Sequence, residues 1–197
     1  MFPERIETDR LVLERISAET VDVFELHELY ADGDDAEELF QYWDSSPHAT
    51  VKETNDYVRE AERLWDDGEG AKYVILPKDG EEGAGVIAGT TGLYPDWEKR
   101  SANLGILLDT PFWGRGYSGE RADAVISVAF DRLELELVVA AHMDGNENSR
   151  RAISKYVDRY GGRYDGRFRN WIPLPDTVAD VHRYTISRDE YLEATGD

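Results

Sequence analysis

The spacing of apolar residues predicts a chain of short strands and amphipathic helices. One stretch is apolar at i, i+3, i+4, i+7, i+8 and i+11, which places these side chains on one face of a helix: Ala122, Val125, Ile126, Ala129, Phe130 and Leu133. Helical spacing predicts two earlier helices and one later one, at residues 18–30, 54–65 and 146–160. Apolar runs bounded by turn residues predict strands at 6–16, 71–76, 85–93, 101–109, 135–142, 167–172 and 181–187.

The connections between these elements predict the topology of the sheet. Residues 77–83 and 95–100 are short and rich in turn residues, so the strands that they join should be antiparallel. A helix separates strands 101–109 and 135–142, and a strand–helix–strand unit makes that pair parallel. We therefore expect an α/β (α+β) fold with a mixed, mostly antiparallel sheet, and a single domain over residues 1–197.

A glycine-rich turn follows the strand at 101–109 and precedes the predicted helix. Gly114, Gly116 and Gly119 allow positive φ angles and lack a Cβ, so successive N–H groups can converge on an anion at the helix N-terminus. The turn is interpreted as a site for the pyrophosphate of CoA or a nucleotide. A P-loop is excluded because no Gly-Lys-Ser/Thr ends the turn, and the dinucleotide fingerprint lacks the acidic residue expected about 20 residues later.

Around this turn the chain resembles the GNAT acyltransferase superfamily and, within it, the ribosomal-protein N-acetyltransferases. The family loop Gln/Arg-x-x-Gly-x-Gly/Ala corresponds to residues 113–118, with Trp113 and Ser118 as departures. Similar segments are found at residues 7–15, in the Asn-x-x-Ser turn at 146–149, and at 164–171. The resemblance covers residues 7 to 188 and implies a central parallel strand pair that splays apart, flanked by helices, to admit the pantetheine arm of acetyl-CoA.

The resemblance implies a set of cofactor-binding residues. The backbone of Ile106, Leu107 and Leu108 would pair with the pantetheine amides, and an N–H near Leu107 or Leu108 would donate to the thioester carbonyl. Asn146 would lie beside the pantetheine arm, although helix capping explains an asparagine there as well. The residues expected to bind the pyrophosphate are Gly114, Arg115, Gly116, Tyr117, Ser118 and Gly119.

The acid–base residues match the family less fully. Ser149 has the position of the serine credited with protonating the leaving CoA thiolate, or it is an ordinary hydroxyl in a helix. Some relatives carry a Glu and a Tyr where this chain has Ala141 and Ile153, neither of which transfers a proton. Tyr156, one turn beyond, is a second candidate acid or a core aromatic. His142, at a strand end, is the candidate base.

The absence of a Glu at position 141 bears on which amine accepts the acetyl group. An α-amine has a pKa of about 7.7 to 8.0 against roughly 10.4 for lysine, so deprotonating lysine costs about 3.4 kcal/mol more. The predicted activity is therefore acetyl transfer by direct attack of a primary amine, foremost the N-terminal α-amine of a protein. A small-molecule amine acetyltransferase and a non-catalytic CoA-binding module are the alternatives. The expected pocket walls, residues 32–50, 94–100 and 168–180, carry no decodable motif.

Composition narrows the class of protein. Forty-two acidic and 22 basic residues give a net charge of −20, dispersed along the chain, which is typical of a halophilic surface in molar salt, where the Debye length is about 3 Å. A field that attracts cationic substrates is the alternative. The sequence shows no stripe of basic residues that could neutralise phosphates, so nucleic-acid binding is not expected. It also shows no apolar span and no signal region, so a cytoplasmic protein is expected. Absent cysteine and scattered histidines predict no metal site. A homodimer is a family expectation.

Overall fold

The computed structural model describes residues 1–31, 36–42, 46–174 and 177–196. Its strands form one eight-stranded sheet in the order β1-β2-β3-β4-β5-β6-β8-β7. Only β5 and β6 pair in parallel, and the other neighbours are antiparallel, which confirms the predicted mixed sheet. The strands are β1 Arg5–Glu7, β2 Leu11–Arg15, β3 Ala71–Pro77, β4 Gly89–Asp96, β5 Ser101–Leu108, β6 Leu137–Met143, β7 Arg163–Pro173 and β8 Val178–Ser187.

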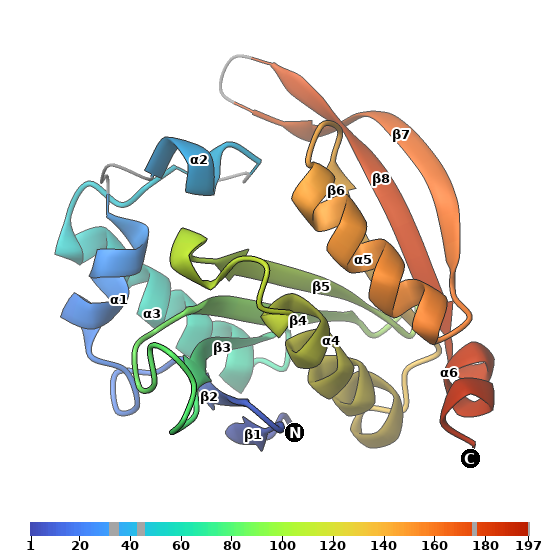
Figure 1. Cartoon of the computed structure of the whole chain (residues 1–197), viewed down its shortest axis with the longest axis horizontal. Helices are drawn as coiled ribbons and strands as arrows, with labels where there is room; N and C mark the ends of the chain where they lie inside the picture. The colour runs from blue at the N-terminus through green and yellow to red at the C-terminus, as the bar shows by residue number, and fades with distance from the viewer. Residues whose placement is uncertain (32–35, 43–45, 175–176, 197) are drawn as a thin grey trace.

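Helices cover both faces of the sheet (Figure 1). One buried cluster joins the first three helices to the sheet through Val74 and Leu107, and a second cluster, on the opposite face, includes Tyr73 and Ile75. Successive residues of β3 thus alternate between the two cores, as the pleat of a strand requires. The helices are α1 Val23–Tyr30, α2 Ala36–Phe40 and α3 Val51–Asp66 on one face, and α4 Tyr117–Ser127, α5 Glu147–Arg159 and α6 Arg188–Thr195 with the other core.

Several predicted elements differ in extent. The strand predicted at 6–16 is divided into β1 and β2, because Thr8 bonds Leu11 across a turn. Residues 85–88, predicted as strand, form the end of a turn and an irregular segment before β4. The helix predicted from residue 18 begins only at Val23, where Asp22 caps it by accepting from the N–H of Phe24. The long helix predicted to residue 133 ends in a π-helical turn, Val128–Arg132.

Two helices were not predicted. Helix α2 lies within the segment expected to be a connection. Helix α6 begins with a capping box, in which Ser187 and Glu190 each bond the other's backbone N–H. That Ser-x-x-Glu pattern was a readable signal for the second of these helices.

The parallel pair at the centre of the sheet is short. Strands β5 and β6 are in register for only three residue pairs, from Ser101↔Leu137 to Asn103↔Val139. Beyond this point β5 stays paired with β4, while β6 stays paired with β8. The two strands therefore diverge, and the inner edge of residues 104–108 has no partner strand in the described sheet (Figure 1). The predicted splay of the parallel strands is confirmed.

Helix α4 is fixed to the sheet by one carboxylate. Glu120 accepts hydrogen bonds from the Thr8 hydroxyl at 2.6 Å, from the Arg10 N–H at 2.7 Å and from the Arg10 guanidinium at 2.8 Å. Burial raises the pKa of Glu120, but these hydrogen bonds outweigh that effect and leave the pKa below its ordinary value. The glycine turn, which directly precedes α4, is therefore held in a defined position relative to β2.

We expect Glu120→Gln to lower the free energy of unfolding by about 2 kcal/mol at neutral pH, because it removes hydrogen bonds to a charged, poorly exposed group. Since the folded-state pKa of Glu120 is depressed, its stabilisation is present above the unfolded pKa and is lost as the pH falls through the folded value. Urea denaturation should therefore show a smaller difference between variant and parent in acid, below about pH 4.

The control for this variant is Glu19→Gln, because Glu19 is exposed. That change should alter the stability by less than about 0.5 kcal/mol. Equal effects of the two substitutions, or a Glu120→Gln effect that does not change with pH, would contradict the anchoring role.

Candidate active site

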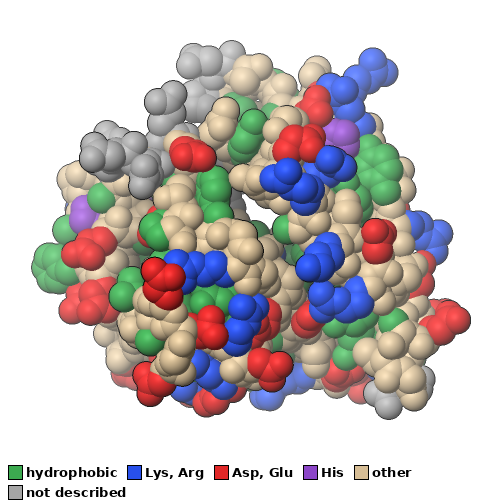
Figure 2. All heavy atoms as spheres, viewed as in Figure 1, with side chains coloured by type: hydrophobic (Ala, Val, Ile, Leu, Met, Phe, Trp, Pro, Cys, Tyr) green, Lys and Arg blue, Asp and Glu red, His purple; other side chains and the backbone are tan. Residues whose placement is uncertain are grey.

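The diverging strands and two helices enclose a hollow. Figure 2 shows the molecule hollowed near the centre of this face, between the side formed by β5 and α4 and the side formed by α5. We call the gap between β5 and β6, where this hollow lies, the slot.

Lys and Arg side chains gather on the α5 side of the hollow. In a chain of net charge −20, helix α5 carries only two acidic residues and four exposed basic ones. The basic residues are Arg150, Arg151, Lys155 and Arg159.

The predicted pantetheine-binding residues lie on one wall of the slot. Ile106, Leu107 and Leu108 are each paired with β4, from Ile106↔Thr91 to Leu108↔Gly89. Gly89 permits this approach, because a Cβ there would lie 2.2 Å from the carbonyl oxygen of Leu107. The β4 side thus fixes one edge of the backbone, while the edge toward β6 has no strand partner in the described sheet.

The glycine turn has the conformation that its sequence predicts at two of three positions. Gly114 has φ +75° and Gly116, the N-cap of α4, has φ +84°, with no side-chain cap at that helix end. The first N–H group of the helix that bonds a helical carbonyl is that of Gly119, which donates to the carbonyl of Gly116. The N–H groups before Gly119 at this helix end therefore have no acceptor within the helix. Gly119 lies inside the helix without a positive φ, so the predicted positive φ is wrong there.

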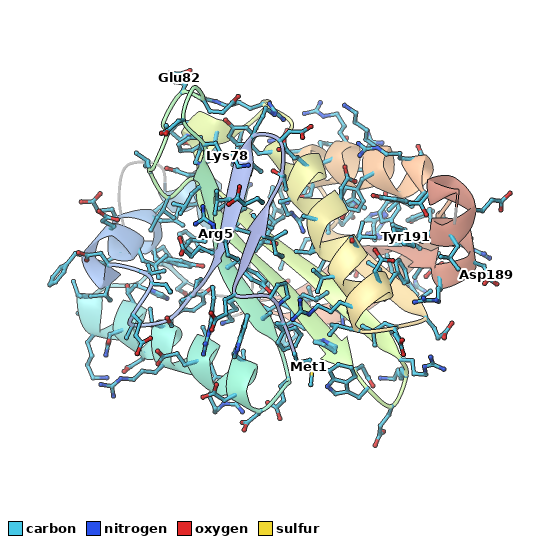
Figure 3. All side chains as sticks on the ribbon, turned by 90° about the horizontal axis from the view of Figure 1, so that it is seen from below. Met1, Arg5, Lys78, Glu82, Asp189 and Tyr191 are labelled. Atoms are coloured by element: carbon cyan, nitrogen blue, oxygen red, sulfur yellow. The ribbon has the colours of Figure 1, made fainter. Side chains whose placement is uncertain are left out.

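Two side chains of the turn are held by the β3–β4 loop, on which Figure 3 labels Lys78 and Glu82. Arg115 forms an ion pair with the Glu82 carboxylate at 3.2 Å and donates to its carbonyl at 3.0 Å. The hydroxyl of Tyr117, which is fully buried, donates to Glu81 at 2.8 Å. Because both side chains are already bonded to the loop, Arg115 and Tyr117 would contact a ligand more readily through their backbone than through their side chains. Ser118 is partly buried at the start of the helix.

Helix α5 forms the opposite wall of the slot. The side-chain oxygen of Asn146 accepts from the N–H of Ser149 at 2.9 Å, so the capping role of this asparagine is observed. Ser149 and Tyr156 are seven residues apart and therefore share one face of the helix. Ser149 is partly buried, whereas Tyr156 is 1% exposed. Burial raises the pKa of Tyr156 to about 12, and the nearby Arg121 opposes that rise.

His142 lies on β6 on the side of α5. Its Nδ1 donates to the carbonyl of Met143 at 2.9 Å, which leaves the lone pair on Nε2, 3.4 Å from the hydroxyl of Tyr184. The ring stacks on His182 with a centroid distance of 4.9 Å. Burial lowers the pKa of His142. The side chain is therefore a neutral imidazole at neutral pH, with Nε2 as its proton acceptor.

Sequence reasoning missed a polar cluster on the other face of the sheet. The hydroxyl of Tyr30 lies 2.8 Å from that of Thr90 and 3.0 Å from that of Tyr57. Thr90 is paired with Leu107, so the cluster adjoins the strand that lines the slot. Burial raises the pKa of Tyr30 to about 12. Residues so far apart in the chain gave no joint signal.

The predicted acceptor walls are only partly described. His48, in the first wall, stacks on Tyr30 with a centroid distance of 4.7 Å. In the third wall, Trp171 is 62% exposed and packs on Phe168 in the β7–β8 hairpin. Residues 32–35, 43–45 and 175–176 of these walls lie outside the described residues.

The described residues hold neither a metal-binding cluster nor a membrane-spanning helix. No group of three or more His, Cys, Asp or Glu side chains there could hold a metal ion. Of the helices in that part of the chain, none is long and apolar enough to cross a membrane.

Comparisons with known proteins agree with this geometry. A family model described as an acetyltransferase (GNAT) domain matches residues 10–156. The N-acetyltransferase p20 of Bacillus licheniformis is 24% identical over 189 residues, which are 95% of this chain and 98% of that protein.

Two solved structures share the fold at low sequence identity. The microcin C7 self-immunity acetyltransferase MccE, in complex with acetyl-CoA and AMP, has a TM-score of 0.79 at 15% identity, covering 94% of this chain and 97% of that one. A Salmonella typhimurium acetyltransferase that modifies the N-terminal serine of a 50S ribosomal subunit protein has a TM-score of 0.77 at 19% identity, covering 91% and 96%. Because the family model spans well over half of the sequence, the chain belongs to the GNAT family of acetyltransferases.

Proposed function

We propose that this N-acetyltransferase moves an acetyl group from acetyl-CoA to the N-terminal α-amine of a protein, by direct attack without a covalent enzyme intermediate. The observation that carries the proposal is the slot, which ends beside a helix N-terminus with unused N–H groups. A long donor with an anionic pyrophosphate and an amide-bearing arm fits both features. The Salmonella neighbour, whose acceptor is a protein N-terminus, supports the choice of acceptor.

The backbone of this chain would hold the donor. N–H groups from Gly114 to Gly119 would bind the pyrophosphate, and the free edge of Ile106, Leu107 and Leu108 would pair with the amides of the arm. Acetyl-CoA supplies the activated acyl group as a thioester. An N–H near Leu107 or Leu108 would donate to the thioester carbonyl and stabilise the charge that develops on its oxygen. Asn146, whose side-chain oxygen caps α5, would lie beside the arm.

Two hydroxyls on α5 are the candidate acids. When the amine nitrogen bonds to the carbonyl carbon, the C–S bond breaks and its electron pair goes to sulfur. Ser149 or Tyr156 would give the sulfur a proton and regain one from solvent. Both lie on the face of α5 that carries Ile153, and neither hydroxyl makes a recorded hydrogen bond to another described residue.

The acceptor amine must lose a proton, but no carboxylate is present to take it at the position that some relatives use. That position, on β6, is Ala141 in this chain. Neutral His142, with its lone pair on Nε2, is the proposed acceptor of that proton, reached through Tyr184 or water. An imidazole of lowered pKa is a weak base. It therefore suits an α-amine, which loses its proton near neutral pH, better than a lysine side chain.

The first test is cofactor binding, measured by calorimetric titration of acetyl-CoA in molar KCl. We expect 1:1 binding in the micromolar range, and Gly114→Ala should weaken it at least about tenfold (about 1.4 kcal/mol), because a Cβ enters the open space beside the turn. Gly161→Ala is the matched control, since Gly161 also has a positive φ and open space around its Cβ. It should cost similar stability yet leave binding unchanged. No binding to folded parent protein would refute the acetyltransferase proposal.

The second test separates the candidate acids. We expect Tyr156→Phe or Ser149→Ala to lower kcat at least about a hundredfold, which is the low end of the contribution of one acid–base group, with a smaller change in KM for acetyl-CoA. Initial rates on a peptide acceptor would measure both. If neither single substitution nor the double variant slows turnover, the assigned acid is wrong.

The third test concerns the acceptor class. Two peptides of one sequence should be compared, one with a free N-terminus and no lysine, the other N-terminally blocked with one lysine. At neutral pH kcat/KM should be higher for the α-amine, by up to about 300-fold if deprotonation alone decides. Faster acetylation of the lysine, or of a polyamine, would overturn the acceptor assignment while leaving the donor assignment intact.

A further inference from the structure

A positive charge is buried beneath the glycine turn without a partner. Arg121, in α4, is 2% exposed and heads the largest fully buried side chains. Its Nε and Nη1 have no hydrogen-bond partner among the described residues. The titratable groups whose charges act on it are Tyr156 on α5 and Asp123 on its own helix. Asp123, however, is bonded to Arg159 and to the hydroxyl of Tyr160.

Such a side chain is unfavourable for folding alone. A buried ion that lacks a counter-ion and hydrogen bonds is strongly destabilising, and an apolar side chain of similar volume is more favourable in its place. Arg121 therefore lowers the stability of the free protein. A ligand that brings negative charge to this position would recover the lost interactions.

The position of Arg121 indicates which part of a ligand could reach it. Helices α4 and α5 pack together, and they bound the slot from its two sides (Figure 1). Gly114 and Gly116 are exposed at the turn, whereas Arg121 is buried one turn further into α4, so a pyrophosphate on the turn does not explain it. Tyr156 on α5, which acts electrostatically on Arg121, is as deeply buried. Two buried polar groups, neither of them in a hydrogen-bonded pair with another described side chain, thus lie between the two helices that bound the slot.

We propose that Arg121 binds the CoA thiolate as the thioester breaks, beside Tyr156, which gives the sulfur its proton. This inference rests on the proposed function. The C–S electron pair goes to sulfur, the phenol proton follows, and the tyrosinate left beside the guanidinium regains a proton from solvent. Arg121 thus stabilises the negative charge first on sulfur and then on the Tyr156 oxygen, and it positions the acid.

Binding of CoA and desulfo-CoA, which lacks the sulfur, tests this without an acceptor. Calorimetric titrations from neutral pH to about pH 9, where thiols ionise, should show the preference for CoA over desulfo-CoA rising at least fivefold in the parent. In Arg121→Met this preference should not change with pH. The same variant should have a higher unfolding midpoint, because it removes an unpaired buried charge, and a kcat at least tenfold lower.

Three further variants separate the charge from packing. Arg121→Lys keeps a charge and should retain part of the pH-dependent preference for CoA. Val125→Ala, a buried change on the same helix, should lower stability yet retain the whole preference. In a Tyr156→Phe background, Arg121→Met should reduce kcat by much less than tenfold, because the two residues act on one step.

The outcomes distinguish the two proposals. If both the parent and Arg121→Met bind CoA, and their preference for CoA over desulfo-CoA rises equally with pH, the thiolate role alone is overturned. If Arg121→Met has a lower unfolding midpoint than the parent but the same preference for CoA, Arg121 is structural, and the thiolate role is again overturned. Failure of the folded parent to bind either compound refutes the proposed function and this inference with it.

Discussion

The central constraint in this molecule is that β5 and β6 cannot stay paired with each other while β5 remains paired with β4 and β6 with β8. Each strand satisfies its backbone on one side over its whole length, β5 with β4 and β6 with β8. They share only three residue pairs before diverging. Because the sheet on each side is continuous, the slot is set by backbone hydrogen bonds rather than by side chains. Its walls are therefore expected to be rigid and its shape tolerant of side-chain changes.

Helix ends complete this arrangement. Helix α4 begins without a side-chain cap, immediately after two glycines in the left-handed region, whereas α5 is capped by Asn146. The uncapped N-terminus is thus the one that can accept an external anion. Around it the chain places basic residues on α5, although its overall charge is strongly negative.

Two neighbouring charged residues of α4, one partly buried and one fully buried, show the difference between structural and functional polarity. Glu120 has partners for its carboxylate from Thr8 and Arg10, and it fixes α4 to the sheet. Arg121, the next residue, has neither a counter-ion nor partners for two of its nitrogens among the described residues. Unused hydrogen-bonding groups at the turn and on Ser149 and Tyr156 belong to the elements that bound the same slot. Polar groups that folding leaves unsatisfied are those available to a ligand.

The sequence by itself determined the order of elements, the parallel pair, the glycine turn and the family, because apolar periodicity, turn residues and a loop motif are local properties. It misplaced helix starts, and it missed α6 although a Ser-x-x-Glu pattern was present. Only the tertiary structure decided where polar side chains meet. Tyr30, Tyr57 and Thr90 join across distant segments, and Arg121, which is not among the apolar positions predicted for its helix, is buried. Burial and hydrogen-bond satisfaction depend on residues far away in the chain, and no local pattern records them.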